Sequence, residues 1–245
     1  MICTIVTCPQ GEYKDHPGIE RRSNGPSRHI LVVKDTHYHP AIERALFSNT
    51  DWNLIRNCPC TLLLVKPRVL GKRPCIVAAV DPVHRHDKPA DLDRRILTLA
   101  GDLCEATGGR LHVLHVFDPA PVVAAETTLM VTPAAAPVRE LTGQLEQRHR
   151  KAFEALLQGH SLPPIQTHLR RGTPHELLIE LSVQLQAELV VMGAVSRRGL
   201  ERAFIGSTAE KVLDHLPCDL LIVNPPETVS TPHGRTTGGS SSGIA

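Results

Sequence analysis

The sequence predicts an α/β fold, with a five-stranded, mostly parallel sheet, helices on both of its faces and a partial strand–helix–strand copy near the N-terminus. Three observations lead to this prediction. Short apolar runs alternate with stretches of helical periodicity from residue 75 to residue 223. One strand–helix–strand segment occurs twice. Hydrophobic residues make up 41% of the 245 residues and aromatic residues only 3%, so we expect a core of aliphatic side chains.

The repeat relates residues 31–67 to residues 189–225. The two segments align without a gap at an offset of 158 residues, and 13 of their 37 positions are identical. This offset predicts domains of about 150 residues, and only one copy has room for a domain of that length. We therefore expect an irregular segment at 1–29, the C-terminal remnant of a first domain at 30–68, a complete domain at 72–227 and a disordered tail at 228–245.

The elements of the complete domain follow from the spacing of its apolar residues. Continuous apolar runs indicate buried strands of a parallel sheet, and apolar residues three and four positions apart indicate helices. Gly108-Gly109 favours a left-handed cap at the end of the first helix, and Pro174 suits the first turn of the third. The expected elements are strand 75–80, helix 90–107, strand 111–117, helix 138–159, strand 165–170, a helix from 174, strand 189–192, helix 207–216 and strand 219–223.

Composition excludes several classes of protein. The formal net charge is only +2, from 27 basic and 25 acidic residues, which argues against a strongly basic nucleic-acid binder. Few aromatic side chains are available to stack on bases or sugars. We find no apolar stretch of about 18 residues and no signal-like start, so we expect a cytoplasmic protein without a membrane span. An odd number of cysteines, seven, favours reduced thiols over a disulfide framework.

Dedicated catalysis and metal binding have little support in the motifs. The chain has no nucleophile elbow, no credible triad order, no P-loop and no dinucleotide-binding glycine turn. Cys58-Pro59-Cys60 supplies only two thiols, whereas a structural zinc site needs four ligands. The run His84 to Asp87 has ligand residue types, but histidine-rich loops are common without a metal. We expect no metal site and no enzyme activity beyond slow ATP hydrolysis at most.

Candidate ligand groups follow the ends of three strands. Open α/β sheets bind ligands at the carboxyl ends of their strands, near the point where the strand order reverses. Asp81 follows the first strand, Val116 lies at the end of the second, and Gly193 ends the fourth. Gly193 has no side chain and therefore leaves room for a flat base or a ribose. Further candidates beyond it are Ser196, Arg197, Gly206, Ser207 and Thr208.

Gly206-Ser207-Thr208 opens the predicted fourth helix. Backbone N–H groups and the helix dipole favour an anion there, which predicts a phosphate contact. A second interpretation stays open, because Ser207 and Glu210 also match a capping box, which needs no ligand. The first copy keeps a capping residue, Asn49, but loses both glycines of the second copy. This difference favours a ligand role in the second copy only.

These residues resemble a known nucleotide-binding motif. Gly193-x-x-Ser196, nine further residues and Gly206-Ser207 are similar to the motif of the universal stress protein family, which is G-x-x-G, nine residues, then G-[S/T]. The strand ends Val80-Asp81 and Leu114-His115-Val116 also lie where this family places them. The tandem arrangement resembles the E-type members of the family, and the resemblance covers residues 30–227.

The resemblance implies a five-stranded α/β domain that, in some members, binds ATP with Mg²⁺ or a related nucleotide. One position departs from the motif, since Ser196 replaces the second glycine and its Cβ would crowd the phosphate path. By matching positions, the base and ribose would lie near Asp81 and Val116, the fourth strand would end at Gly193, and the phosphates would lie at Gly206, Ser207 and Thr208.

The family also pairs its domains through their last strands. This implies pairing of Leu62–Val65 with Leu220–Val223, either inside one chain or between two chains of a homodimer. We expect a stress-response module that binds a ligand or transmits a signal. Two alternatives stay open: a ligand-free dimerisation scaffold, and a binder of a lipid-like ligand in a groove over Leu114, Val116 and the loop from Pro119 to Pro137.

Overall fold

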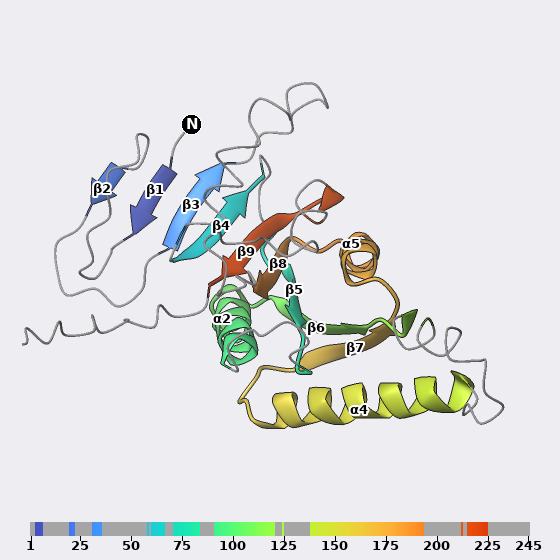
Figure 1. Cartoon of the computed structure of the whole chain (residues 1–245). Coiled ribbons are helices and arrows are strands. Elements are labelled where there is room, and N and C mark those ends of the chain that lie inside the picture. The colour runs from blue at the N-terminus through green and yellow to red at the C-terminus, as the bar shows by residue number, and fades with distance from the viewer. Residues whose placement is uncertain are drawn as a thin grey trace, which may run out of the picture.

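The computed structural model describes residues 3–6, 20–22, 31–35, 58, 60–66, 71–83, 91–120, 124, 138–193, 212 and 215–224. Its described strands form one nine-stranded sheet in the order β2-β1-β3-β4-β9-β8-β5-β6-β7 (Figure 1). Most neighbouring strands are parallel; the pairs β1–β3 and β4–β9 are antiparallel. The predicted α/β class is confirmed, with helices packed against a mostly parallel sheet.

The complete domain contributes the strands β9-β8-β5-β6-β7, all of them parallel. Each described strand or helix lies within about two residues of its predicted bounds. The predicted helix 207–216 lies mostly outside the described residues. The elements are β5 (Cys75–Val80), α2 (Leu92–Thr107), β6 (Arg110–Phe117), α4 (Val138–Gln158), β7 (Ile165–Arg171), α5 (Pro174–Gln184), β8 (Leu189–Gly193) and β9 (Asp219–Val223).

Helix ends follow the predicted local chemistry. Gly108 has a left-handed φ of 60°, and the N–H of Gly109 donates to the carbonyl of Cys104 at 2.9 Å. Only glycine adopts this conformation without strain, so α2 ends at this point. Pro174 lies in the first turn of α5, where its missing N–H would have no helical partner.

The helices cover opposite faces of the sheet (Figure 1). Alternate residues of β5 point to opposite faces, so Ile76 packs with Leu92 and Ile96 of α2, while Val77 belongs to the cluster that contains Leu178 of α5. Phe153 of α4 joins the α2 side. The complete domain therefore has the two-sided covering that a parallel sheet requires.

The N-terminal part of the sheet departs from the sequence prediction in one respect. We expected residues 1–29 to be irregular, yet β1 (Cys3–Val6) and β2 (Glu20–Arg22) lie within them. The β-branched run Thr4-Ile5-Val6 favours a strand, and β3 (Leu31–Asp35) provides an edge with which β1 pairs. β4 (Thr61–Val65) then pairs in parallel with β3.

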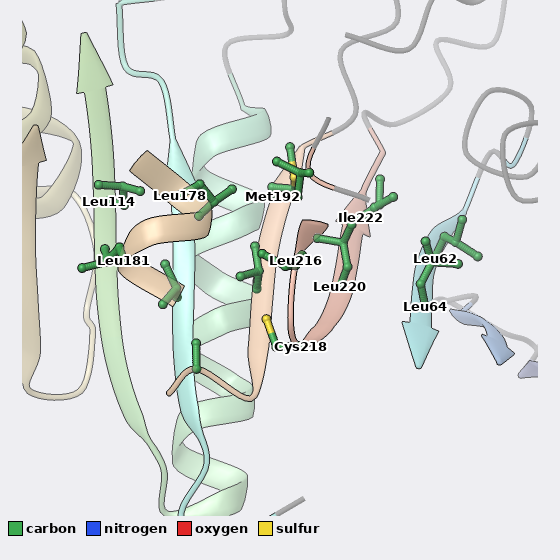
Figure 2. Packing of buried hydrophobic residues seen from close by; sticks show 14 of the residues in the cluster. Leu62, Leu64, Leu114, Leu178, Leu181, Met192, Leu216, Cys218, Leu220 and Ile222 are labelled. Atoms are coloured by element: carbon green, nitrogen blue, oxygen red, sulfur yellow. The ribbon is translucent and has the colours of Figure 1, made fainter. Parts of the chain in front are cut away.

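The two copies of the repeat meet where β4 pairs with β9, within the one chain. Leu63 lies opposite Leu221, which is its own counterpart at the offset of 158 residues. A strand pair centred on equivalent residues has the form of a two-fold, self-complementary interface. Leu62, Leu64, Leu220 and Ile222 belong to one buried cluster that continues into the complete domain (Figure 2). The flanking pairs are Leu62 with Ile222 and Leu64 with Leu220.

The hydrogen bonds at this junction are also related by the repeat. Asn224, after β9, donates from Nδ2 to the carbonyls of Cys58 at 2.6 Å and Cys60 at 2.8 Å, just before β4. Lys66, the counterpart of Asn224 after β4, donates from Nζ to the carbonyl of Leu216, the counterpart of Cys58. Each copy thus satisfies buried carbonyl groups of the other.

Candidate functional site

The candidate site lies where the strand order of the complete domain reverses. From β5 the chain adds β6 and then β7 on one side, and β8 and then β9 on the other. The carboxyl ends of β5 and β8 therefore diverge at a topological switch point, which is where ligands bind in open α/β sheets. β5 ends at Val80 and β8 ends at Gly193, so the structure brings the predicted residues Asp81 and Gly193 to the two sides of this point.

Asp81 is held by the start of helix α2. Its backbone N–H donates to Oδ1 of Asp93 at 3.1 Å, and Asp93 is 0% exposed in the first turn of the helix. The carboxylate of Asp81 accepts the N–H of Val83 at 3.3 Å and remains half-buried. A carboxylate has room for about four hydrogen bonds. The Asp81 side chain is thus positioned by the backbone and retains capacity for further donors.

Gly193 has a packing role that the sequence did not reveal. A Cβ on this residue would lie 2.7 Å from Cδ2 and 3.1 Å from Cγ of Leu92, and 3.3 Å from Cδ1 of Ile96. Such distances are shorter than van der Waals contact, so the absent side chain of Gly193 lets α2 pack closely on β8. The direction of the missing side chain is therefore occupied by α2.

Val116 follows the last paired residues of β5 and β6. The ladder between these strands ends at Val80 and His115, so Val116 and Asp81 are the next residues along two adjacent parallel strands. Val116 is half-buried and packs against the cluster on the α5 face. The structure thus gathers Asp81, Val116 and Gly193 at the ends of three neighbouring strands.

The sequence profile of the universal stress protein family matches residues 76–224. The chain belongs to this family. Universal stress protein E of Salmonella typhi is 32% identical over 200 residues, which are 81% of this chain and 62% of that protein. Its counterpart in Escherichia coli K12 is 31% identical over 198 residues, 80% of this chain and 61% of that protein. The chain thus spans about three-fifths of the length of these relatives.

A solved structure has a similar fold. PA1789 from Pseudomonas aeruginosa PAO1, described as functionally unknown, is 28% identical and superposes with a TM-score of 0.62. The superposition covers 80% of this chain and 63% of that one. The family match and the two E-type relatives confirm the E-type universal stress resemblance.

Two hydrogen-bonded histidines, His115 and His149, lie behind the candidate site of the universal stress domain. His115, 0% exposed, lies 3.1 Å from the carbonyl of Val80 through Nδ1 and 2.8 Å from Nδ1 of His149 through Nε2. A carbonyl only accepts, so Nδ1 of His115 donates to Val80, and one proton lies between Nε2 of His115 and Nδ1 of His149. This histidine pair links α4 to Val80, the residue that precedes Asp81. Sequence reasoning missed both the histidine pair and Asp93, since buried polar partners leave no periodic signal in the sequence.

Five predicted site residues of the universal stress domain lie outside the described residues. The run His84 to Asp87 also lies outside them. Of the loop from Pro119 to Pro137, only Pro119, Ala120 and Ala124 are described. Within the described residues, no group of three or more His, Cys, Asp or Glu side chains is arranged to hold a metal ion. No described helix is long and apolar enough to cross a membrane. The five residues are Ser196, Arg197, Gly206, Ser207 and Thr208.

Proposed function

We propose that the complete universal stress domain binds an adenine nucleotide at the switch point between β5 and β8, and that the protein acts in the cytoplasm as a ligand-dependent stress-response module without a dedicated catalytic activity. The observation that carries this proposal is the arrangement of Asp81, Val116 and Gly193 at the ends of neighbouring strands on either side of the strand-order reversal.

The residues have distinct roles in this proposal. The half-buried Asp81 carboxylate accepts hydrogen bonds from ribose hydroxyls or the adenine amine, and Val116 packs against the base. Gly193 contributes its backbone, because its side-chain direction is occupied by Leu92. The phosphates of ATP, with Mg²⁺, would be held by N–H and hydroxyl groups of Gly206, Ser207 and Thr208, with the Arg197 charge nearby.

The first test identifies what the protein carries. Small molecules are released from gently purified protein by denaturation and analysed by mass spectrometry, and the empty protein is then heated with and without Mg-ATP. Ligand at about 100 times Kd stabilises by about 2.7 kcal/mol, which raises the Tm by roughly 5–10 °C for a protein of this size. Stoichiometric ATP or ADP and such a shift support the proposal.

Three substitutions and one control variant locate the nucleotide. Asp81→Ala should abolish most of the thermal shift, whereas Asp102→Ala on the exposed side of α2 should leave it unchanged. Ser196→Gly restores the motif glycine and should increase affinity, while Gly206→Trp should prevent phosphate binding. Equal shifts in the Asp81 and Asp102 variants would place the nucleotide elsewhere on the chain.

The buried β4–β9 junction favours a second candidate function, that of a ligand-free scaffold. In a scaffold the sheet pairing is the functional feature, and a homodimer would assemble through other surfaces than the β4–β9 pair. An empty protein with no response to Mg-ATP supports this candidate. Recovery of a lipid instead would support the third class, a lipid-like ligand over Leu114 and Val116.

A further inference from the structure

The junction between the two copies contains a pair of thiols in contact. Cys58 and Cys60 directly precede β4, with Cys58 only 6% exposed and Cys60 half-buried. The thiol of Cys60 and its backbone N–H both donate to the sulfur of Cys58, and these hydrogen bonds lower the pKa of the Cys58 thiol against the opposing effect of burial. Five cysteines are free thiols, namely Cys58, Cys60, Cys75, Cys104 and Cys218.

Two other buried cysteines, Cys75 and Cys104, differ in this respect. Burial raises the pKa of the Cys75 and Cys104 thiols, with smaller contributions from neighbouring charges. A thiolate, not a thiol, reacts with oxidants, so a thiol hydrogen-bonded in this way reacts before one that is only buried. Cys58 therefore has a partner sulfur and favourable electrostatics, whereas Cys104 provides a control with neither.

The second copy shows that packing does not require sulfur at this position. The counterpart of Cys58 is Leu216, and both side chains belong to the same buried cluster (Figure 2 labels Leu216). Pro59-Cys60, by contrast, matches Pro217-Cys218. The thiol at position 58 is thus present in the first copy alone. One amide nitrogen, Nδ2 of Asn224, donates to the carbonyls of both Cys58 and Cys60, at 2.6 and 2.8 Å, and so anchors the backbone of both cysteines at the same point.

We propose that Cys58 and Cys60 form a redox modification site, in which hydrogen peroxide converts the thiol pair into a reversible disulfide at the β4–β9 junction. Disulfides need Cα atoms about 4.4–6.8 Å apart, a range that residues two positions apart reach in an extended or turn conformation. Disulfides that are strained or exposed are the ones that are readily reduced, as expected for a bridge over a single residue.

The chemistry balances with peroxide as the oxidant. The Cys58 thiolate attacks one peroxide oxygen, the O–O bond breaks, and the departing hydroxide takes a proton to become water. Cys58 is then a sulfenic acid. The sulfur of Cys60 attacks the Cys58 sulfur, the S–O bond breaks, and a second water leaves as the S–S bond forms. The two sulfurs lose two electrons, and the peroxide is reduced to two waters.

The test uses the full chain, reduced, then exposed to peroxide under native conditions and blocked with an alkylating reagent. Trypsin releases both cysteines in the fragment 57–68 and Cys104 in the fragment 96–110. We expect fragment 57–68 to lose two hydrogen masses and to regain them with dithiothreitol. Loss of its thiols should be roughly tenfold faster than loss of the Cys104 thiol.

Two variants make the outcome decisive. Cys58→Leu installs the residue of the second copy, so it should fold, and it should not form the disulfide. Cys60→Ser should leave Cys58 as a sulfenic acid that a dimedone reagent traps. Oxidation of fragment 57–68 no faster than of Cys104 would overturn the proposal. A disulfide that instead joins Cys60 to Cys218 would overturn it too, because the pair would not be Cys58 with Cys60.

Discussion

The strand–helix–strand unit occurs twice in this chain, and its two copies have different surroundings. In the second copy, β8 and β9 lie inside the sheet, between β5 of the complete domain and β4 of the first copy. In the first copy, β3 and β4 lie between β9 and the short strand β1. The same sequence pattern thus forms the centre of a domain in one place and an addition to its edge in the other.

Several of the positions that the two copies share lie in the junction. Leu62 and Leu63 match Leu220 and Leu221, and all four are in or beside the β4–β9 pair. The ends of the preceding strands differ instead, with Lys34-Asp35 in the first copy and Met192-Gly193 in the second. The repeat therefore retains its pairing surface and differs where a ligand would bind.

The largest expected effect tests whether both copies belong to one cooperative fold. Leu62 is 0% exposed and its counterpart Leu220 is 2% exposed, so Leu62→Ala and Leu220→Ala each truncate a buried side chain. We expect each to lower the free energy of unfolding by about 2–5 kcal/mol, measured by urea denaturation. Val183→Ala, at a position 58% exposed, is the control and should change stability by less than about 0.5 kcal/mol. If Leu62→Ala resembled the control, the first copy would not contribute to the cooperative unfolding of the second.

A smaller effect is expected from the hydrogen bonds that cross the junction. Asn224→Ala leaves the carbonyls of Cys58 and Cys60 without that donor and should cost about 1–3 kcal/mol. Lys66→Met removes the reciprocal bond to Leu216 at a half-buried position and should cost less, about 1 kcal/mol. Urea denaturation of the two variants and of the double variant measures this difference. A larger loss of stability in Lys66→Met than in Asn224→Ala would contradict this prediction, because the hydrogen bond from the first copy would then contribute more than those from the second.

Gly193→Ala separates the packing role of this residue from a ligand role. The new Cβ would meet Leu92 at 2.7 Å, and overpacking of this kind costs about 1–3 kcal/mol. Gly143→Ala in α4 is the matched control, since nothing lies within 4 Å of its added Cβ, and it should stabilise the helix by up to about 1 kcal/mol. Thermal unfolding with and without Mg-ATP gives both quantities. Loss of the nucleotide response with unchanged stability would assign Gly193 to the ligand alone.

Much of the fold could be predicted from the sequence, because apolar periodicity determines which residues are buried. The strand at residues 75–80 is correct at both ends, and the end of α2 is marked by Gly108. β1 was missed because a strand of four residues is too short to show a period. At the site, Asp81 and Gly193 were found from their places at strand ends. Asp93 and the His115–His149 pair were not, since their roles depend on contacts between residues 12 and 34 positions apart.

The smallest expected effect is a pH dependence confined to the complete domain. His112 of β6 and His168 of β7 lie with Nδ1 and Nε2 3.0 Å apart and their rings stacked. Burial is the main cause that lowers the pKa of each below its ordinary value of 6.5, with smaller contributions from His168 and Arg110 at His112 and from Arg170 at His168. The unfolded chain therefore binds more protons than the folded one as the pH falls through 6.5.

It follows that these two histidines favour the folded state fully above pH 6.5 and progressively less as the pH drops toward their lower folded pKa values. Urea denaturation at pH 7.5 and 5.5 should show this loss in the wild-type chain and a smaller loss in His168→Asn, in which one of the two titrating rings is absent. The β4–β9 junction contains no histidine in its paired residues, so Leu62→Ala should keep the wild-type dependence. Equal losses of stability in the wild type and in His168→Asn would show that the acid sensitivity arises at groups other than this histidine pair.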